Sequence, residues 1–157
     1  MAQMKLSKKR RAQLQHIISQ YERTRQFPGF SACLDMLDAG ADELEWGLSI
    51  LRNHAPEHVE EFVQALQAPE HESVRWLLLE AVGATHSDAV VPLLAGYLHS
   101  SDSDLWGWAI RALREIDTKE ARRVLWEARS YVFATDEETV RFQERLAEVL
   151  AERPKPG

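Results

Sequence analysis

Cysteine, glycine-rich loops and long apolar runs are scarce in this sequence of 157 residues. The single cysteine, Cys33, cannot form an intramolecular disulfide, so nothing points to an oxidising compartment. No apolar run approaches the ~20 residues of a transmembrane helix, and no apolar segment of a secretory signal follows the basic N-terminus. We therefore expect a cytoplasmic protein with no membrane span, folded as one domain over residues 1–157.

Sets of catalytic and metal-binding residues are also missing. The sequence has no glycine-rich phosphate loop and signals no Ser/His/Asp or Cys/His set. His54 and His58 have the four-residue spacing of metal ligands on a helix, but Pro56 interrupts the helix between them. Cys33 lies on an apolar stripe and is interpreted as a small core residue. We predict no catalytic residue, no metal site and no cofactor, and hence a protein that is not an enzyme.

Basic residues are few outside the N-terminus. Residues 1–25 hold seven Lys or Arg and one Glu, whereas the other 132 residues hold 12 basic and 24 acidic side chains. An acidic body repels phosphate backbones, which disfavours nucleic acid, and suits a partner with a basic surface. The basic run at 8–11 leaves open a contact with RNA or anionic lipid, although no aromatic residue is interleaved with it.

What the sequence does contain is helical periodicity, with almost no alternating segment of strand type. Three apolar stripes, at 59–66, 90–97 and 121–128, are each displaced by 31 residues. Two helices per unit therefore repeat in register across three units. The helix before each stripe keeps the same displacement, which takes Trp46 to Leu77 and Trp108, Ile50 to Ala81 and Ala112, and Leu51 to Val82 and Leu113.

The repeat divides the chain into expected units. A divergent first unit spans 5–38, repeats follow at 42–67, 72–99 and 103–130, and a last helix at 136–152 closes the open end of the stack. Thr135 and Glu138 form a capping-box pattern at the start of that last helix.

Two tryptophans two residues apart must point to different sides of a helix, because each residue advances the side chain by about 100°. Trp108 shares its repeat position with Trp46 and Leu77, so we expect it in the core. Trp106 falls on the flank of the same helix, where we expect it to pack against a neighbouring helix or loop.

The repeat unit resembles the HEAT family, in particular its short bacterial form. The family pattern is met by Val74, Arg75, Ala81, Val82 and Gly83 in the first helix of the unit at 74–98, and by Asp88, Leu93 and Leu94 in the second. The match extends to 105–129, where Trp106 replaces the family arginine, and more weakly to 43–67. The resemblance implies an all-α, right-handed solenoid of antiparallel helix pairs with a C-terminal capping helix.

HEAT-like solenoids bind other macromolecules along the concave surface that their second helices line. The outward residues of these helices are the predicted binding site, which runs from an acidic end through an apolar centre to a basic end with an aromatic residue. Its members are Glu60, Glu61, Gln64, Val91, Pro92, Ala95, Arg122, Arg123 and Trp126. The alternative surface, on the convex face, carries Trp106 and Arg75.

Enzymes with a HEAT-like fold offer two comparisons, and both fail on the residues. His71 and Glu72 form one His-Glu pair, where di-iron hydroxylases of this fold need four. Trp106, Trp108 and Asp104 superficially match the HEAT-like alkylpurine DNA glycosylases, but those use a basic cleft in a longer chain.

The function that we predict is therefore binding of another protein with a basic surface. An inhibitor or immunity protein that covers the cleft of a basic toxin fits these features. An adaptor, or an assembly or lyase-type subunit of a larger enzyme, fits them as an alternative.

Overall fold

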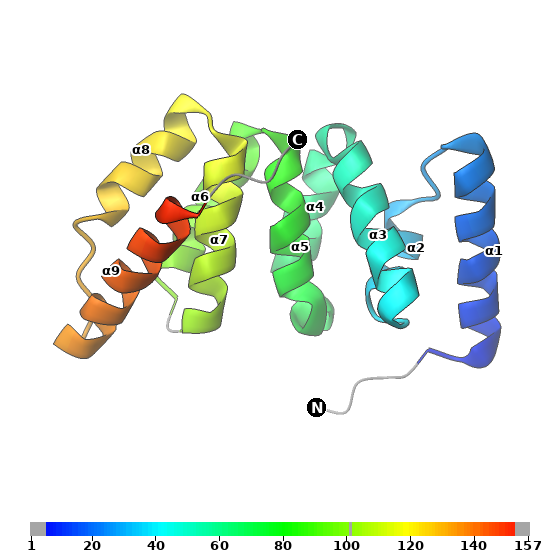
Figure 1. Cartoon of the computed structure of the whole chain (residues 1–157), viewed down its shortest axis with the longest axis horizontal. Coiled ribbons are helices and arrows are strands. Elements are labelled where there is room, and N and C mark those ends of the chain that lie inside the picture. The colour runs from blue at the N-terminus through cyan, green and yellow to red at the C-terminus, as the bar shows by residue number, and fades with distance from the viewer. Residues whose placement is uncertain (1–5, 101, 153–157) are drawn as a thin grey trace.

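The computed structural model describes residues 6–100 and 102–152, and over these residues the chain is helical with no strand. The first expected unit begins at residue 5, which lies outside the described part of the chain. The helices, drawn in Figure 1, are α1 (Lys8–Thr24), α2 (Phe30–Leu37), α3 (Ala41–His54), α4 (Val59–Gln67), α5 (Arg75–Val82), α6 (Val91–Leu98), α7 (Ser103–Ile116), α8 (Lys119–Ala128) and α9 (Asp136–Ala151), with short 3-10 segments η1 (Ala55–Glu57), η2 (Pro69–Val74), η3 (Gly83–Thr85) and η4 (Asp88–Val90).

These helices form two layers. In Figure 1, α1, α3, α5 and α7 stand side by side in a row, which we call the first layer, while α2, α4 and α6 lie behind them. Helix α8 continues the second layer because it contacts α6 and α7, and α9 packs against α7 at the C-terminal end of the row. The predicted all-α solenoid of helix pairs is confirmed.

Polar side chains fix where several helices begin. The Ser7 hydroxyl accepts a hydrogen bond from the Arg10 N–H at 3.1 Å, and Thr118 accepts one from the Ala121 N–H at 3.1 Å. The N-terminal cap expected at Thr135 is present, since its hydroxyl accepts from the Glu138 N–H at 3.1 Å. Each cap satisfies a backbone donor that has no partner inside its helix.

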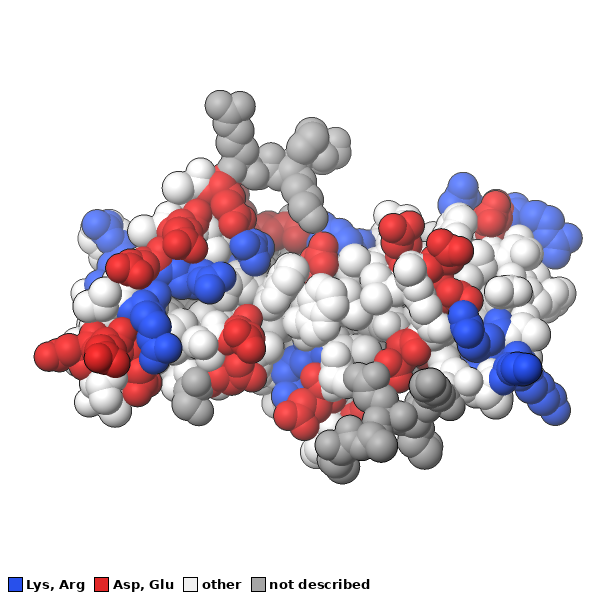
Figure 2. Space-filling view, turned by 60° about the horizontal axis from the view of Figure 1, so that its bottom comes forward, with Lys and Arg blue, Asp and Glu red and all other residues white. Residues whose placement is uncertain are grey.

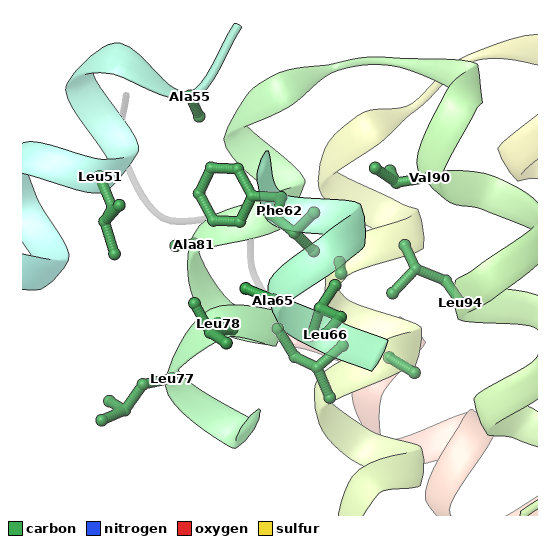
Figure 3. Packing of buried hydrophobic residues seen from close by; sticks show 14 of the residues in the cluster. Leu51, Ala55, Phe62, Ala65, Leu66, Leu77, Leu78, Ala81, Val90 and Leu94 are labelled. Carbon is green, nitrogen blue, oxygen red and sulfur yellow. The ribbon is translucent and has the colours of Figure 1, made fainter. Parts of the chain in front are cut away.

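The core follows the 31-residue register in the first layer. The three residues at each of three repeat positions are buried: Gly47, Leu78 and Ala109, then Ile50, Ala81 and Ala112, then Leu51, Val82 and Leu113. In the second layer, Phe62 of α4 is fully buried. Figure 3 shows its ring beside Ala55 and Ala81, where it joins the two layers.

The two neighbouring tryptophans of α7 exchange their expected roles. Trp106 is 2% exposed, and its indole N–H donates to the Ser100 carbonyl oxygen at 2.9 Å. Its ring lies 5.1 Å from that of Phe133 and 5.2 Å from that of Phe142, measured between centroids. Trp108 is only half-buried. The expectation of a core Trp108 and a flanking Trp106 is wrong, because α9 and the loop before it cover the flank of α7.

Two arginines at the same repeat position tie first-layer helices together. Arg52, at the end of α3, donates to the Glu80 carbonyl oxygen of α5 at 2.6 Å and forms an ion pair with Glu115 of α7. Arg114, 62 residues later on α7, donates to the Val149 carbonyl oxygen of α9 at 2.7 Å. Helix α9 therefore takes the place of the next first-layer helix in the row.

Candidate functional site

The structure places most of the predicted binding residues on the outer side of the second layer. Seven of the nine are exposed, and Ala95 is half-buried. We call the eight residues other than Val91 the second-layer surface: Glu60, Glu61 and Gln64 on α4, Pro92 and Ala95 on α6, and Arg122, Arg123 and Trp126 on α8.

Val91 does not belong to this surface, because it is 1% exposed and lies in the core. Helix α6 follows directly on the 3-10 segment η4, and a 3-10 turn advances each side chain by about 120° rather than 100°. The helix is thereby rotated, so that Val91 and Leu94 point inward, while Leu93 is only half-buried. The sequence register assumed that all second helices start in the same phase, and this assumption was wrong for α6.

The arginines at the expected basic end are paired with carboxylates of their own segment. Arg122 Nη1 lies 3.1 Å from Asp117 Oδ1. Arg123 forms ion pairs with Glu120 and, at 2.5 Å, with Glu127, and these hydrogen bonds raise the pKa of Arg123 and lower that of Glu120. The C-terminal end of the second-layer surface is therefore charge-balanced rather than basic.

Trp126 is the most exposed aromatic side chain on this surface. Its exposed fraction is 68%, and the Arg129 guanidinium lies 4.6 Å from the ring centroid. Val132, two residues after Ser130, is 81% exposed and extends the apolar area beyond α8. Large exposed apolar side chains at one place are typical of contact sites for other proteins.

The acidic end is supported by a histidine. Glu61 Oε1 lies 2.6 Å from His58 Nδ1, and the His58 ring stacks on Phe27 with centroids 4.0 Å apart. Glu60 is exposed next to it on α4. These contacts hold Glu61 in a defined direction at the N-terminal end of the second-layer surface.

The basic run at the N-terminus helps to hold α1 in place. Arg10 Nη2 lies 2.7 Å from Asp35 Oδ2 of α2, and Arg11 Nη2 lies 3.7 Å from Glu43 Oε1 of α3. Two of the four consecutive cations are thus paired with carboxylates of neighbouring helices, which reduces the charge available to a phosphate.

Chemistry at the described residues is limited. Within 6–100 and 102–152 no group of three or more His, Cys, Asp or Glu side chains is placed to hold a metal ion. The Cys33 side chain is fully buried, and burial, with a smaller effect from the charge of Glu61, raises the pKa of its thiol to about 12. At neutral pH this cysteine is a thiol rather than the thiolate that acts as a nucleophile.

We expect the Cys33 thiol to resist labelling in the folded protein. A thiol-specific disulfide reagent at pH 8 should react with Cys33 only as fast as the protein opens, and at once in concentrated denaturant, because both burial and the raised pKa of the thiol suppress the thiolate. The measurement is the absorbance of the released reagent anion over time. Rapid stoichiometric labelling of the folded protein would contradict the buried position.

The repeat seen in the coordinates is matched by a family description. A family model of HEAT repeats matches residues 59–143, which run from the start of α4 into α9 and make up more than half of the chain. The chain belongs to the HEAT-repeat family. No curated protein and no solved structure matches it. Proteins built from HEAT repeats are generally interaction modules for other proteins and are typically not enzymes.

Among the described helices of this HEAT-repeat protein, none combines the length and the apolar composition that a transmembrane span requires. The alternative surface around Trp106 and Arg75 is not formed by those residues. Trp106 is buried, and Arg75 is half-buried with its Nε–H donating to the Leu66 carbonyl oxygen at 3.3 Å.

Sequence reasoning missed Trp76, which lies on the first layer. It is 40% exposed and occupies the repeat position of Glu45 and Gly107. A tryptophan at a position that is otherwise charged or small was the signal that could have identified it, since such a residue does not serve the core pattern.

Proposed function

We propose that this HEAT-repeat protein is a non-enzymatic binding module that holds one partner protein on its second-layer surface. The observation that carries the proposal is Trp126, a tryptophan that is 68% exposed at one end of that surface. Tryptophan is among the residues that most often dominate the energy of protein interfaces, and an exposed one gains more from a partner than any charged neighbour.

The second-layer surface offers different contacts along its length. Pro92 and Ala95 form a small, uncharged centre on α6, where a partner can approach closely. The carboxylates of Glu60 and Glu61 at one end attract a basic surface and set its orientation. At the other end, Arg122 and Arg123 can exchange their exposed intramolecular ion pairs for ion pairs with the partner at little cost, because exposed pairs contribute little stability.

The partner is a protein with a basic surface, and the protein acts on it as an inhibitor of the immunity type. The net charge of −12 on residues 26–157 supports a basic partner, because opposite charges accelerate association. An adaptor or assembly subunit of a larger enzyme is the second candidate, favoured by the family's general use in interactions. Titrating the purified partner separates the two: an inhibitor abolishes the partner's activity at one equivalent, whereas an adaptor leaves that activity intact.

Replacing Trp126 by alanine is expected to weaken partner binding at least about tenfold, mainly through faster dissociation. The free energy of unfolding should hardly change, because the side chain is largely exposed. The partner is first captured from an extract of the native cells and purified, and its association and dissociation rates are then measured by surface plasmon resonance.

Two matched variants control this experiment. Val132→Ala removes an apolar side chain that is 81% exposed but lies outside the second-layer surface, so it should leave dissociation unchanged. Replacing Glu60 and Glu61 by lysine should slow association, more at low salt than at high salt. A partner that binds all these variants like the wild type would rule out the second-layer surface as the binding site.

A further inference from the structure

The outer side of the first layer is acidic. On α3, η2, α5 and α7, all of the charged side chains that are exposed are carboxylates. In Figure 2, which keeps α5 in the middle of the row, an uncharged area occupies the centre of the view, with carboxylates in red on both sides of it. The exposed carboxylates are Asp42, Glu45, Glu70, Glu72 and Asp104.

The arginines of the same helices do not neutralise these carboxylates. All four are half-buried, and each guanidinium donates to a group other than the exposed five. Their acceptors are Glu115 and the Glu80 carbonyl for Arg52, the Leu66 carbonyl for Arg75, Glu152 for Arg111, and the Val149 carbonyl for Arg114. The first layer therefore uses its cations for bracing between helices and leaves its surface negative.

Trp76 lies on α5 within this acidic surface, with 40% of its side chain exposed. One turn before it along the chain is Glu72, one turn after it is Glu80, and Glu45 occupies the same repeat position on the adjacent helix α3. Residues one turn apart on a helix are about 5–6 Å apart at Cβ, and packed helices lie about 8–10 Å apart. The exposed indole is thus surrounded by carboxylates at the distances that separate neighbouring side chains of an extended chain.

The orientation of Trp76 is fixed from beneath. Its ring packs on that of Trp108, with centroids 5.3 Å apart and planes tilted by 46°. The Arg111 guanidinium lies 5.1 Å from the Trp108 ring centroid and is held by Glu152 of α9 through hydrogen bonds of 3.0 and 2.7 Å. Helices α5, α7 and α9 therefore hold Trp76 in place before any partner arrives, which lowers the entropic cost of binding.

We propose that this first-layer surface binds an arginine-rich or lysine-rich extended segment of a partner protein, with one cation over the exposed Trp76 indole and its neighbours facing the carboxylates. Tryptophan is the strongest cation–π acceptor among the side chains, and arginine is its most frequent partner. The surrounding carboxylates concentrate cations and repel nucleic acid and anionic lipid. The site is separate from the second-layer surface, so it stands or falls independently of the function proposed above.

The test uses a short, unstructured peptide of alternating glycine and arginine that carries a dye, titrated with the full chain while fluorescence anisotropy is recorded. Trp76→Ala is expected to raise the dissociation constant about fivefold. Trp126→Ala removes the other exposed tryptophan and should have no effect, which makes it the matched control.

Charge is tested by a second matched pair of variants. Replacing Glu45 and Glu72 by glutamine should weaken binding and reduce its salt dependence, whereas the same change at Glu60 and Glu61, on the second layer, should not. Equal losses for both double variants would show attraction by net charge alone and would overturn the site. No binding of the peptide by the wild type would overturn it as well.

An independent readout covers the case that Trp76→Ala impairs folding. In the wild-type protein, the indole ¹H–¹⁵N signal of Trp76 should shift on addition of the peptide, and that of Trp126 should not. A shift confined to Trp126, or no shift at Trp76, would contradict the proposal whatever the variants do.

Discussion

Trp106→Ala is expected to lower the free energy of unfolding by about 3–5 kcal/mol, the cost typical of removing a large buried aromatic side chain. Trp106 is 2% exposed, and its ring contacts Phe133 and Phe142. The change also removes the indole N–H that donates to the Ser100 carbonyl oxygen at 2.9 Å. Urea denaturation followed by circular dichroism measures the loss.

Trp108→Ala serves as the comparison for this prediction, because the two residues have the same chemistry and lie on the same helix. Trp108 is half-buried, so a smaller loss of about 1–2 kcal/mol is expected from the smaller apolar area involved. A larger loss for Trp108→Ala than for Trp106→Ala would restore the assignment that the repeat register alone suggested.

Gly47→Ala is expected to destabilise the protein by about 2 kcal/mol, although alanine is the better helix former. Gly47 lies where α3 packs closely on α2. A Cβ at this position would lie 2.8 Å from Met36 Cβ and 3.0 Å from the Cys33 carbonyl oxygen. Neither atom can move by a rotamer change, so α2 must shift away from α3. Thermal and urea unfolding of the variant measure the effect.

Gly96→Ala provides the opposite case in the same chain. Gly96 is exposed on α6, and a Cβ there would meet no atom within 4 Å. Here only helix propensity changes, so a gain of up to about 1 kcal/mol is expected. If both glycine variants shifted stability in the same direction, the contact between α2 and α3 would not be as close as described.

The helical units were predictable from the sequence, since the spacing of apolar residues reflects the geometry of a single helix. The same displacement of 31 residues identified the core of the first layer, as at Ile50, Ala81 and Ala112, which are all buried. The cap at Thr135 was predictable for a similar reason, because a capping hydroxyl binds a backbone N–H three residues away.

The candidate surfaces were predictable only in part. The sequence identified the exposure of Glu60, Arg123 and Trp126, because each lies opposite the apolar stripe of its own helix. It misplaced Val91, because the 3-10 segment before α6 changed the phase of that helix. It also overlooked Trp76, whose environment depends on Trp108 of the following unit.

The sequence by itself determined an all-helical chain, the length of its repeat and the residues that face inward within each unit. Those properties depend on residues a few positions apart, whose relative directions are fixed by the backbone. Only the tertiary structure decided which tryptophan of α7 is buried, since Phe133 and Phe142 cover Trp106 from a later part of the chain. It also decided which arginines remain available on the surface, because pairs such as Arg52 with Glu115 form across units 63 residues apart, where the spacing along the chain no longer fixes the distance in space.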